Sequence, residues 1–356
     1  MSDLPAYDPE RLFPFAVPRD VPAAPQPAPA APAAAAATHR FLHPQGGMVP
    51  GERVLITGIA GSLGRLLTHR LRGRYGVLGV DRNGWPGHPA DVQLHLIDLR
   101  KRRFEDIIRT ERPDTIVHYA FVRHFRGDPE IRHEVNVLGT RRLLEYAAEY
   151  GVKRIVVLSS GYVYGALPDN PTFLDEEASL NVSRTYPAIR DLAEVDHLVL
   201  TFLWKHPEIA TTLLRPVSML GPNSHTAISR FLRARLVPMI VGFDPMMQFI
   251  HEEDVADAVV LAMEKGTRGV FNVVGPGAVP LSVAIRECGG TAVPLLEPVA
   301  RVLFAQLFQL GLYHTPADAI DFLKYSCTLD GRRFVATTGF TPRHSLRSVF
   351  ASIRRR

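Results

Sequence analysis

The stretch VLITGIAGSLG, residues 54–64, decides the fold. It begins with a short apolar run, which is typical of a buried parallel strand. Gly58, Gly61 and Gly64 follow at intervals of three residues, and apolar residues then recur at helical spacing as far as Leu71. A glycine-rich turn between a strand and a helix predicts a cradle for a pyrophosphate, because bare backbone and a helix N-terminus both favour a bound anion.

Each glycine has a predicted role in that cradle. Gly58 would allow the tight turn, Gly61 would let the backbone approach the pyrophosphate, and Gly64 would let the helix pack on the strand. A second strand ends in Asp81, 17 residues beyond Gly64, which is close to the offset of roughly 20 residues for an acid that binds a ribose. Without this acid, a turn that binds nothing would be an equally good interpretation. With it, we predict dinucleotide binding by Gly58, Ile59, Ala60, Gly61, Ser62, Leu63 and Gly64.

Strand-like and helix-like segments alternate after this turn, which predicts an α/β doubly wound parallel sheet of the Rossmann type. The predicted strands are 53–57, 76–80, 93–97, 115–119, 153–159, 211–215 and 269–275, and the predicted helices are 62–72, 103–109, 130–150, 188–205 and 226–234. We expect a disordered tail rich in proline and alanine at 1–47. The dinucleotide domain would be 48–222, joined by 249–275, and a smaller substrate-capping part would be 223–248 and 276–350, with small helices at 278–345.

Composition excludes several classes of protein. The chain has 356 residues, of which 46% are hydrophobic and 22% charged, as is typical of a globular protein. The net charge of +5 comes with basic runs at 100–103 and 354–356, but no nucleic-acid-binding motif accompanies them. There is no apolar run that would span a membrane and no signal peptide. Cys288 and Cys327 lack CxxC spacing and are predicted to be reduced. We therefore predict a cytoplasmic protein without a nucleic-acid or membrane partner.

Several further motifs carry a resemblance to a known family. The segment SSGYVYG, residues 159–165, closely resembles the SSxxVYG stretch of the extended short-chain dehydrogenase/reductases in their NAD-dependent epimerase/dehydratase branch. VNVLGT at 135–140, LLRPVSMLGP at 213–222 and QFIHEEDVA at 248–256 resemble other motifs of that branch, as does FTPRHSL at 340–346. The resemblance runs from about residue 53 to 350. It implies an NAD-dependent enzyme that transfers a hydride at a carbinol or carbonyl carbon of a sugar-like or nucleotide-sugar substrate.

The resemblance also implies a catalytic set. Ser160 stands where the family has the hydroxyl that holds the substrate oxygen, and Tyr186 stands at the Tyr of its YxxxK pair, the general acid or base. Arg190 replaces the expected lysine. Spacing of four would place Tyr186 and Arg190 on one helical face. Arginine keeps the positive charge that lowers the pKa of the tyrosine, but it cannot relay a proton. The site is therefore either catalytic with altered chemistry or a decayed site that only binds dinucleotide.

Further cofactor contacts follow from the resemblance. Asp98 with Leu99 matches the acid that binds the adenine amino group, although capping of the next helix is an equal alternative. Ala120 fits a segment that passes under the adenine, and Asn136 matches an asparagine that holds the active-site backbone. Pro216 lies in the stretch whose backbone contacts the nicotinamide. Tyr186 and Arg190 would contact its ribose. Asp81 favours NAD over NADP, but Arg82 follows it directly, so NADP stays possible.

The substrate is less well specified. Met247 stands where nucleotide-sugar epimerases have an arginine that clasps the diphosphate, and methionine cannot bind phosphate. An NAD(P)-dependent reductase of an apolar carbonyl compound and a non-catalytic dinucleotide-binding sensor or scaffold are therefore the alternatives. His251 and Asp254 are predicted to order a turn, and no metal site is predicted because no second ligand has suitable spacing. The family often forms homodimers through the helices that match 130–150 and 188–205.

Overall fold

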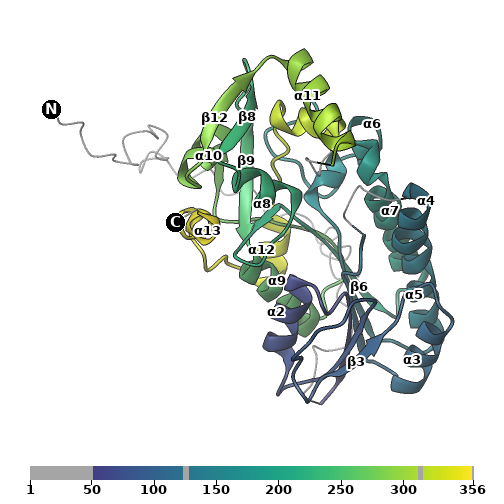
Figure 1. Ribbon diagram of the computed structural model, residues 1–356. Coiled ribbons are helices and arrows are strands. Elements are labelled where there is room, and N and C mark those ends of the chain that lie inside the picture. Colours follow the sequence, from purple (N-terminus) through teal and green to yellow (C-terminus); the bar gives the residue numbers. More distant parts are fainter. Residues whose placement is uncertain (1–50, 123–127, 312–315, 355–356) are drawn as a thin grey trace, which may run out of the picture. The chain divides into compact units, whose positions relative to one another are not determined.

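The computed structural model describes residues 51–122, 128–311 and 316–354, which belong to one compact unit, Leu42–Arg356 (Figure 1). The tail predicted at 1–47 lies outside the described residues. None of the described helices is both long and apolar enough to cross a membrane.

The central sheet consists, within the described residues, of seven parallel strands in the order β10-β6-β5-β4-β1-β2-β3. The strands are β1 (Arg53–Thr57), β2 (Gly76–Asp81), β3 (Gln93–Leu96), β4 (Thr115–His118), β5 (Arg154–Leu158), β6 (Ala210–Pro216) and β10 (Gly269–Val273). Each agrees with a predicted strand to within two residues at either end. The strand order reverses between β1 and β4, and this is where a doubly wound sheet opens a crevice for a ligand.

Helices cover both faces of this sheet (Figure 1). Successive side chains of β1 point to opposite faces of the sheet. Val54 and Ile56 belong to one hydrophobic core, and Leu55 belongs to the other. The first core includes residues of α2 (Ser62–Leu71), α9 (Glu252–Lys265) and α12 (Arg332–Thr338). The second includes residues of α3 (Arg103–Glu111), α5 (Gly139–Glu149) and α7 (Arg190–Lys205).

The predicted helix 130–150 is continuous but changes its winding. It consists of α4 (Pro129–His133), a π-helical segment η3 (Glu134–Leu138) and α5. Single π-helical turns of this kind are frequent at functional sites. The segment holds Asn136 at its centre.

A separate hydrophobic core lies in the part of the chain predicted to cap the substrate. Leu232, Ile285 and Phe304 are among its buried members. The prediction of only small helices at 278–345 is wrong, because β11 (Ala278–Pro280) and β12 (Thr291–Leu295) form there. The remaining elements are η4 (Gly161–Tyr164), α6 (Val182–Thr185), η5 (Pro187–Ile189), β7 (Ser218–Leu220), α8 (Ala227–Leu232), β8 (Leu236–Ile240), β9 (Met246–His251), α10 (Leu281–Glu287), α11 (Glu297–Gln309), η6 (Ala317–Leu323) and α13 (Leu346–Ile353).

Candidate active site

The glycine turn between β1 and α2 has the geometry that its sequence predicts. Gly58 has a φ of +78°, which side chains rarely adopt, and a Cβ on it would come within 3.1 Å of the Ala120 nitrogen. A Cβ on Gly64 would lie 2.4 Å from the Gly58 oxygen, closer than any real contact. Gly61 is the N-cap of α2 and makes no side-chain cap. The turn therefore leaves the first N–H groups of α2 without a capping side chain, as an anion-binding turn requires.

A cavity of about 320 Å³ opens beside this turn, at the carboxyl ends of β1 to β4. Its size falls within the range of small-molecule sites. Predicted residues in its wall are Gly58, Ala60, Gly61, Asp81, Arg82, Asp98, Leu99 and Ala120. The wall does not include Ile59, Ser62, Leu63 or Gly64. The side chains of Ile59 and Leu63 are fully buried core residues, so only the backbone of these two can contribute to the cradle.

Asp81 links the glycine turn to the end of β2. One carboxylate oxygen accepts a hydrogen bond from the Ala60 amide at 3.0 Å, and the other accepts from the Asn83 amide at 2.8 Å. The same side chain lines the cavity together with its neighbour Arg82. Asp81 therefore fixes the turn in place and still offers a carboxylate to a ligand.

Asp98 is held by Arg100 in the cavity wall. Its carboxylate accepts from the Arg100 amide at 2.9 Å and from the Arg100 guanidinium at 2.8 Å. Burial alone would raise the pKa of the Asp98 carboxyl, but the hydrogen bonds and charge of Arg100 outweigh it and lower that pKa. Helix α3 has Arg102 as its N-cap and no side-chain cap, so the alternative of Asp98 capping this helix is wrong.

Asn136 holds the backbone that follows β4. Its side-chain oxygen accepts from the Val122 amide at 2.8 Å, and its amide nitrogen donates to the Val122 carbonyl at 3.1 Å. Val122 and Phe121 line the cavity. Asn136 thus holds the backbone in this cavity wall, and because it is buried it is not a solvated surface asparagine. Its role in an active site stays a prediction.

A second, much smaller cavity lies at the ends of β5 and β6. Its volume of about 20 Å³ has room for roughly one water molecule. Tyr162 and Ser218 meet in its wall with their hydroxyl oxygens 2.9 Å apart. Burial raises the pKa of Tyr162 to about 12, against the opposing effect of the bond to Ser218. The wall otherwise holds Gly161, Pro216, Val217, Met247, Gln248, Phe322, Tyr325, Cys327 and Leu329.

The segment around Leu329 closes this second cavity. Gln248 accepts a hydrogen bond from the Leu329 amide at 2.7 Å and donates one to its carbonyl at 3.1 Å. A Cβ on Gly161 would lie 2.5 Å from the Leu329 side chain, so the glycine is what allows Leu329 to pack there. Sequence reasoning missed this closure, although Gly161 in the SSGYVYG motif offered a signal.

The predicted catalytic residues lie near these cavities but not in their walls. Ser160 lies two residues beyond the end of β5, and its hydroxyl accepts from the Tyr162 amide at 3.3 Å. Tyr186 is buried with its ring 6.1 Å from that of Phe322, which lines the second cavity. Arg190 is exposed at the first turn of α7. The structure thus buries Tyr186 beside Phe322 of the smaller cavity and leaves Arg190 at the surface.

The prediction that Tyr186 and Arg190 share one helical face is wrong. Tyr186 lies at the end of α6 with φ −145° and ψ 75°, and α7 begins only at Arg190. The reason is in the sequence, because position 187 is a proline and the residue before a proline is disfavoured in helical conformation.

A buried ion pair orders the elements around the second cavity. Arg215 of β6 donates to the carboxylate of Asp196 on α7 at 2.7 Å and to the Tyr164 hydroxyl at 2.8 Å. All three side chains are fully buried. Because a buried charge without its partner is costly, this pair fixes β6 against α7 and against the SSGYVYG segment.

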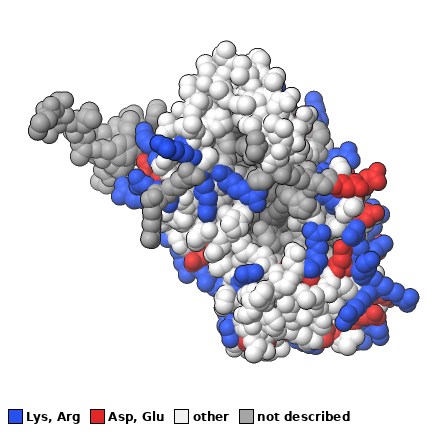
Figure 2. Space-filling model, viewed as in Figure 1, with Lys and Arg blue, Asp and Glu red and all other residues white. Residues whose placement is uncertain are grey.

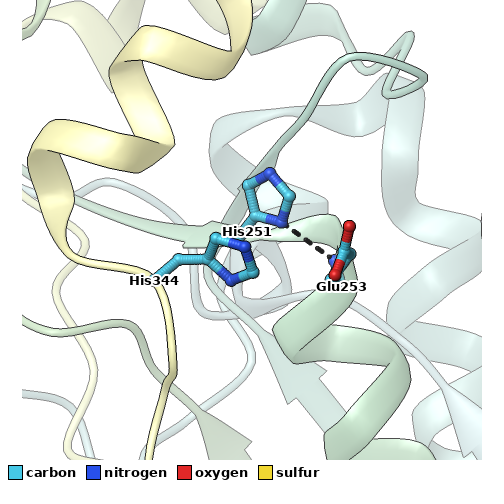
Figure 3. Close-up of side chains that lie close together, drawn as sticks. All are labelled: His251, Glu253 and His344. Atoms are coloured by element: carbon cyan, nitrogen blue, oxygen red, sulfur yellow. Dashed lines mark hydrogen bonds between the residues drawn. The ribbon is translucent and has the colours of Figure 1, made fainter.

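Figure 3 shows a cluster that the sequence did not predict, formed by His251, Glu253 and His344. Their ligand-type atoms all lie within 4.8 Å of one another, so the argument that His251 has no second ligand overlooked His344. The two imidazole rings are stacked at 3.8 Å with an angle of 19°. Lone pairs lie in the ring planes, so stacked rings cannot both point at one ion about 2 Å away.

Hydrogen bonds give the cluster a structural role instead. His251 accepts from the Glu253 amide at 3.3 Å and so caps α9 (Figure 3). The Asp254 carboxylate accepts from the backbone amides of Arg343 and His344 at 3.0 and 3.2 Å. The predicted ordering of this turn by His251 and Asp254 is therefore confirmed, and it extends to the closing FTPRHSL motif.

Fold and site together define a Rossmann-type dinucleotide-binding protein. Comparison with known proteins agrees with this class and also identifies the family. The model of the NAD dependent epimerase/dehydratase family matches residues 54–274. The chain belongs to this family. The predicted family, the doubly wound fold and NAD as cofactor are thereby confirmed.

Individual relatives differ in what they act on. An uncharacterized protein of Mycobacterium tuberculosis is 30% identical over 83% of this chain and 82% of its own length. A 3-diazoavenalumate denitrifying reductase of Streptomyces is 28% identical over 64% of this chain and 77% of its own. Among solved structures, MoeE5 in complex with UDP-glucuronic acid and NAD is 25% identical with a TM-score of 0.67, covering 85% of this chain and 97% of its own.

Proposed function

We propose that this protein binds NAD in the larger cavity and transfers a hydride between the nicotinamide and a carbinol or carbonyl carbon of a substrate. The observation that carries the proposal is the glycine turn, which has no room for a Cβ at Gly64 and borders a cavity of about 320 Å³. The bound cofactor supplies the hydride acceptor or donor. The carboxylate of Asp81 supports NAD over NADP, because it would repel a 2′-phosphate.

The chain supplies the proton chemistry. The deprotonated Tyr186 oxygen takes the proton of a substrate alcohol, or the Tyr186 hydroxyl gives its proton to a carbonyl oxygen, while Ser160 holds that substrate oxygen. Arg190 begins α7, and Tyr186 lies outside that helix. The two side chains are therefore not held one helical turn apart as in a YxxxK pair, and Arg190 acts on Tyr186 only through its positive charge. A decayed site that only binds dinucleotide remains the alternative to this assignment.

The substrate proposed first is a sugar-like molecule or nucleotide sugar. Family membership and the MoeE5 complex with UDP-glucuronic acid support it. The second candidate is an apolar carbonyl compound. It is favoured by the wall of the smaller cavity, which holds Met247, Phe322 and Leu329 but no lysine or arginine among the described residues, and by the reductase activity named for the Streptomyces relative.

We also propose an oligomeric state, a localisation and a substrate-binding part for this protein. The protein is a homodimer that pairs through α5 and α7, it is cytoplasmic, and residues 223–248 and 276–350 bind the substrate. The separate hydrophobic core that includes Leu232 and Ile285 supports the last of these.

The proposed chemistry is tested with Tyr186→Phe, with Tyr150→Phe as the matched control. Tyr150 lies at the end of α5, and its hydroxyl donates a hydrogen bond to the carboxylate of Glu105 on α3. We expect Tyr186→Phe to lower turnover by about 10²-fold or more, the usual contribution of a general acid or base, and Tyr150→Phe to leave it unchanged. The readout is nicotinamide absorbance with UDP-glucose, UDP-glucuronic acid and ketones without a nucleotide.

Arg190→Lys separates a working site from a decayed one in the same assay. We expect this substitution to lower turnover, because the compact ammonium of lysine does not reproduce the position and planar donors of the guanidinium. A large gain of turnover would instead identify a decayed enzyme. Full activity of Tyr186→Phe, or no absorbance change with any of these compounds, would contradict the proposed reaction.

A further inference from the structure

Arg65 lines the larger cavity, although sequence reasoning gave it no role. It lies near the beginning of α2, directly after Gly64. Its Nε–H donates to the Ala60 carbonyl at 2.8 Å, while the Ala60 amide donates to the Asp81 carboxylate at 3.0 Å. The two backbone polar groups of Ala60 in the glycine turn are therefore bound by side chains of opposite charge.

An aromatic ring also holds the Arg65 guanidinium. The guanidinium carbon lies 5.3 Å from the centre of the Trp85 ring, which is within the range of a cation–π contact. Trp85 is itself buried, and the His69 ring meets it edge to face at 6.3 Å. Ala60 accepts from one N–H of the guanidinium, and among the described residues the other N–H groups have no hydrogen-bond partner and the charge has no ion-pair partner. These groups are therefore free to bind a ligand in the cavity.

The other charged side chains of the cavity wall already have partners within the protein. Asp81 accepts from two backbone amides. Asp98 is bound by Arg100. Burial raises the pKa of the Asp98 carboxyl, but Arg100 and, more weakly, Arg82 lower it, so Arg82 lies close enough to act on Asp98. Arg65 is the remaining cation among the described residues of this wall, and its bond to the backbone keeps it at the glycine turn.

We propose that Arg65 binds a phosphate of the cofactor diphosphate, and that Trp85 positions its guanidinium for this contact. The inference rests on the proposed binding of NAD in the larger cavity. A glycine turn that opens a helix offers its amides to a diphosphate, and Arg65 is bound to that same turn. Arginine suits the contact, because its planar N–H groups can donate to two phosphate oxygens at once.

The 2′-phosphate of NADP is a poorer candidate for the group that Arg65 binds. It would lie at the Asp81 carboxylate, which would repel it. The diphosphate is common to NAD and NADP, so Arg65 should contribute equally to the binding of both. The sequence did not indicate this contact, because Trp85 is 20 residues from Arg65 and belongs to none of the motifs.

The test is isothermal titration calorimetry of the full-length protein with NAD and with NADP. We expect Arg65→Met to bind NAD at least about tenfold more weakly than the wild type, because hydrogen bonds from a charged donor to phosphate are lost. Arg65→Lys should recover part of this affinity, because lysine keeps the charge but lacks the planar arrangement of donors.

A matched control removes a similar arginine elsewhere. Lysine and arginine side chains appear in several places on the face shown in Figure 2, so the loss of one positive charge must be tested by itself. Arg74 also lies over an aromatic ring, because its guanidinium carbon is 5.2 Å from the centre of the Tyr75 ring, but it is not part of the cavity wall. We expect Arg74→Met to bind NAD as the wild type does.

Salt separates a contact with phosphate from a disturbance of the turn. Between about 0.05 M and about 0.5 M NaCl, the affinity of the wild type for NAD should fall more steeply than that of Arg65→Met, because ions screen a contact between charges. A turn that is merely distorted in the variant would weaken binding by the same factor at every salt concentration. Circular dichroism shows that each variant is folded.

Four results would each overturn the proposal. They are Arg65→Met that binds NAD as the wild type does, Arg74→Met that binds as weakly as Arg65→Met, an equal salt dependence in Arg65→Met and the wild type, and a larger loss of affinity for NADP than for NAD. Wild-type protein that gives no heat with NAD would refute the proposed cofactor binding, and this inference with it.

Discussion

At the scale of single residues, Gly58 carries the sharpest constraint of the larger cavity. It combines a positive φ with a close approach to the backbone of Ala120. Gly73 has nearly the same φ, +82°, but nothing within 4 Å of its missing Cβ. The two glycines therefore differ in one respect, which is the space that a side chain would need.

We predict that Gly58→Ala destabilises the protein by about 1–3 kcal/mol more than Gly73→Ala. Both substitutions incur the left-handed backbone cost of roughly 1–2 kcal/mol, but only the first forces two segments apart. Urea unfolding measures the difference, and calorimetry should show weaker NAD binding for Gly58→Ala alone. Equal destabilisation by both would mean that the contact with Ala120 is not important.

Single residues also show the limit of reading the site from the sequence. The places of Gly58, Gly61 and Asp81 in the cavity wall followed from their spacing, because a strand, its turn and the next strand of a parallel sheet bring them to neighbouring strand ends. Tyr186 did not, because a proline in the next position ended the helix that the motif implied. Tyr162 and Ser218 are 56 residues apart in the chain, and no local pattern indicated that their hydroxyls would meet.

At the scale of elements, buried His118 joins β1, β4 and the helix that contains η3. Thr140 donates to the Asn136 carbonyl, so its oxygen accepts from His118 Nε2 at 2.8 Å. His118 Nδ1 then accepts from the Thr57 hydroxyl at 2.8 Å. This chain of bonds requires a neutral imidazole, and burial lowers the pKa of His118 to about 3.

The pKa of His118 gives a prediction for acid. Below about pH 6.5 the unfolded chain binds a proton at this histidine and the folded protein does not, so stability is lost as the pH falls. Between pH 6.5 and 5, where most carboxyls are still ionised, the loss should be about 1.5 kcal/mol. His118→Gln should be less stable at pH 7 but lack this part of the slope. Urea unfolding at a series of pH values measures it, and an identical slope in the two proteins would refute the assignment.

Elements of the central sheet were predictable because each strand is an apolar run between turn residues. β8 and β12 were not, since LVPMI and TAVPL each contain a proline, which argues against a strand. Within the described part of the chain they pair only with one another, and strands at an edge tolerate a proline. The sequence failed to predict these two strands because each forms in a two-stranded sheet, where a proline is tolerated.

At the scale of the whole molecule, contacts between distant segments complete the site. Leu329 closes the smaller cavity through Gln248, 81 residues away, and His344 stacks on His251. Such contacts depend on how segments that are far apart in the sequence pack against one another in the folded protein. Spacing within a motif gives no information about them, and this is why the sequence predicted the wall of the larger cavity better than that of the smaller one.

The central claim is that the glycine turn and its cavity bind NAD. Isothermal titration calorimetry of the full-length protein with NAD tests it most directly. We expect a heat of binding with one NAD per chain, weaker binding of NADP because of Asp81, and strongly reduced binding of NAD by the Gly58→Ala variant. A folded wild-type protein that gives no heat with either dinucleotide would contradict the account.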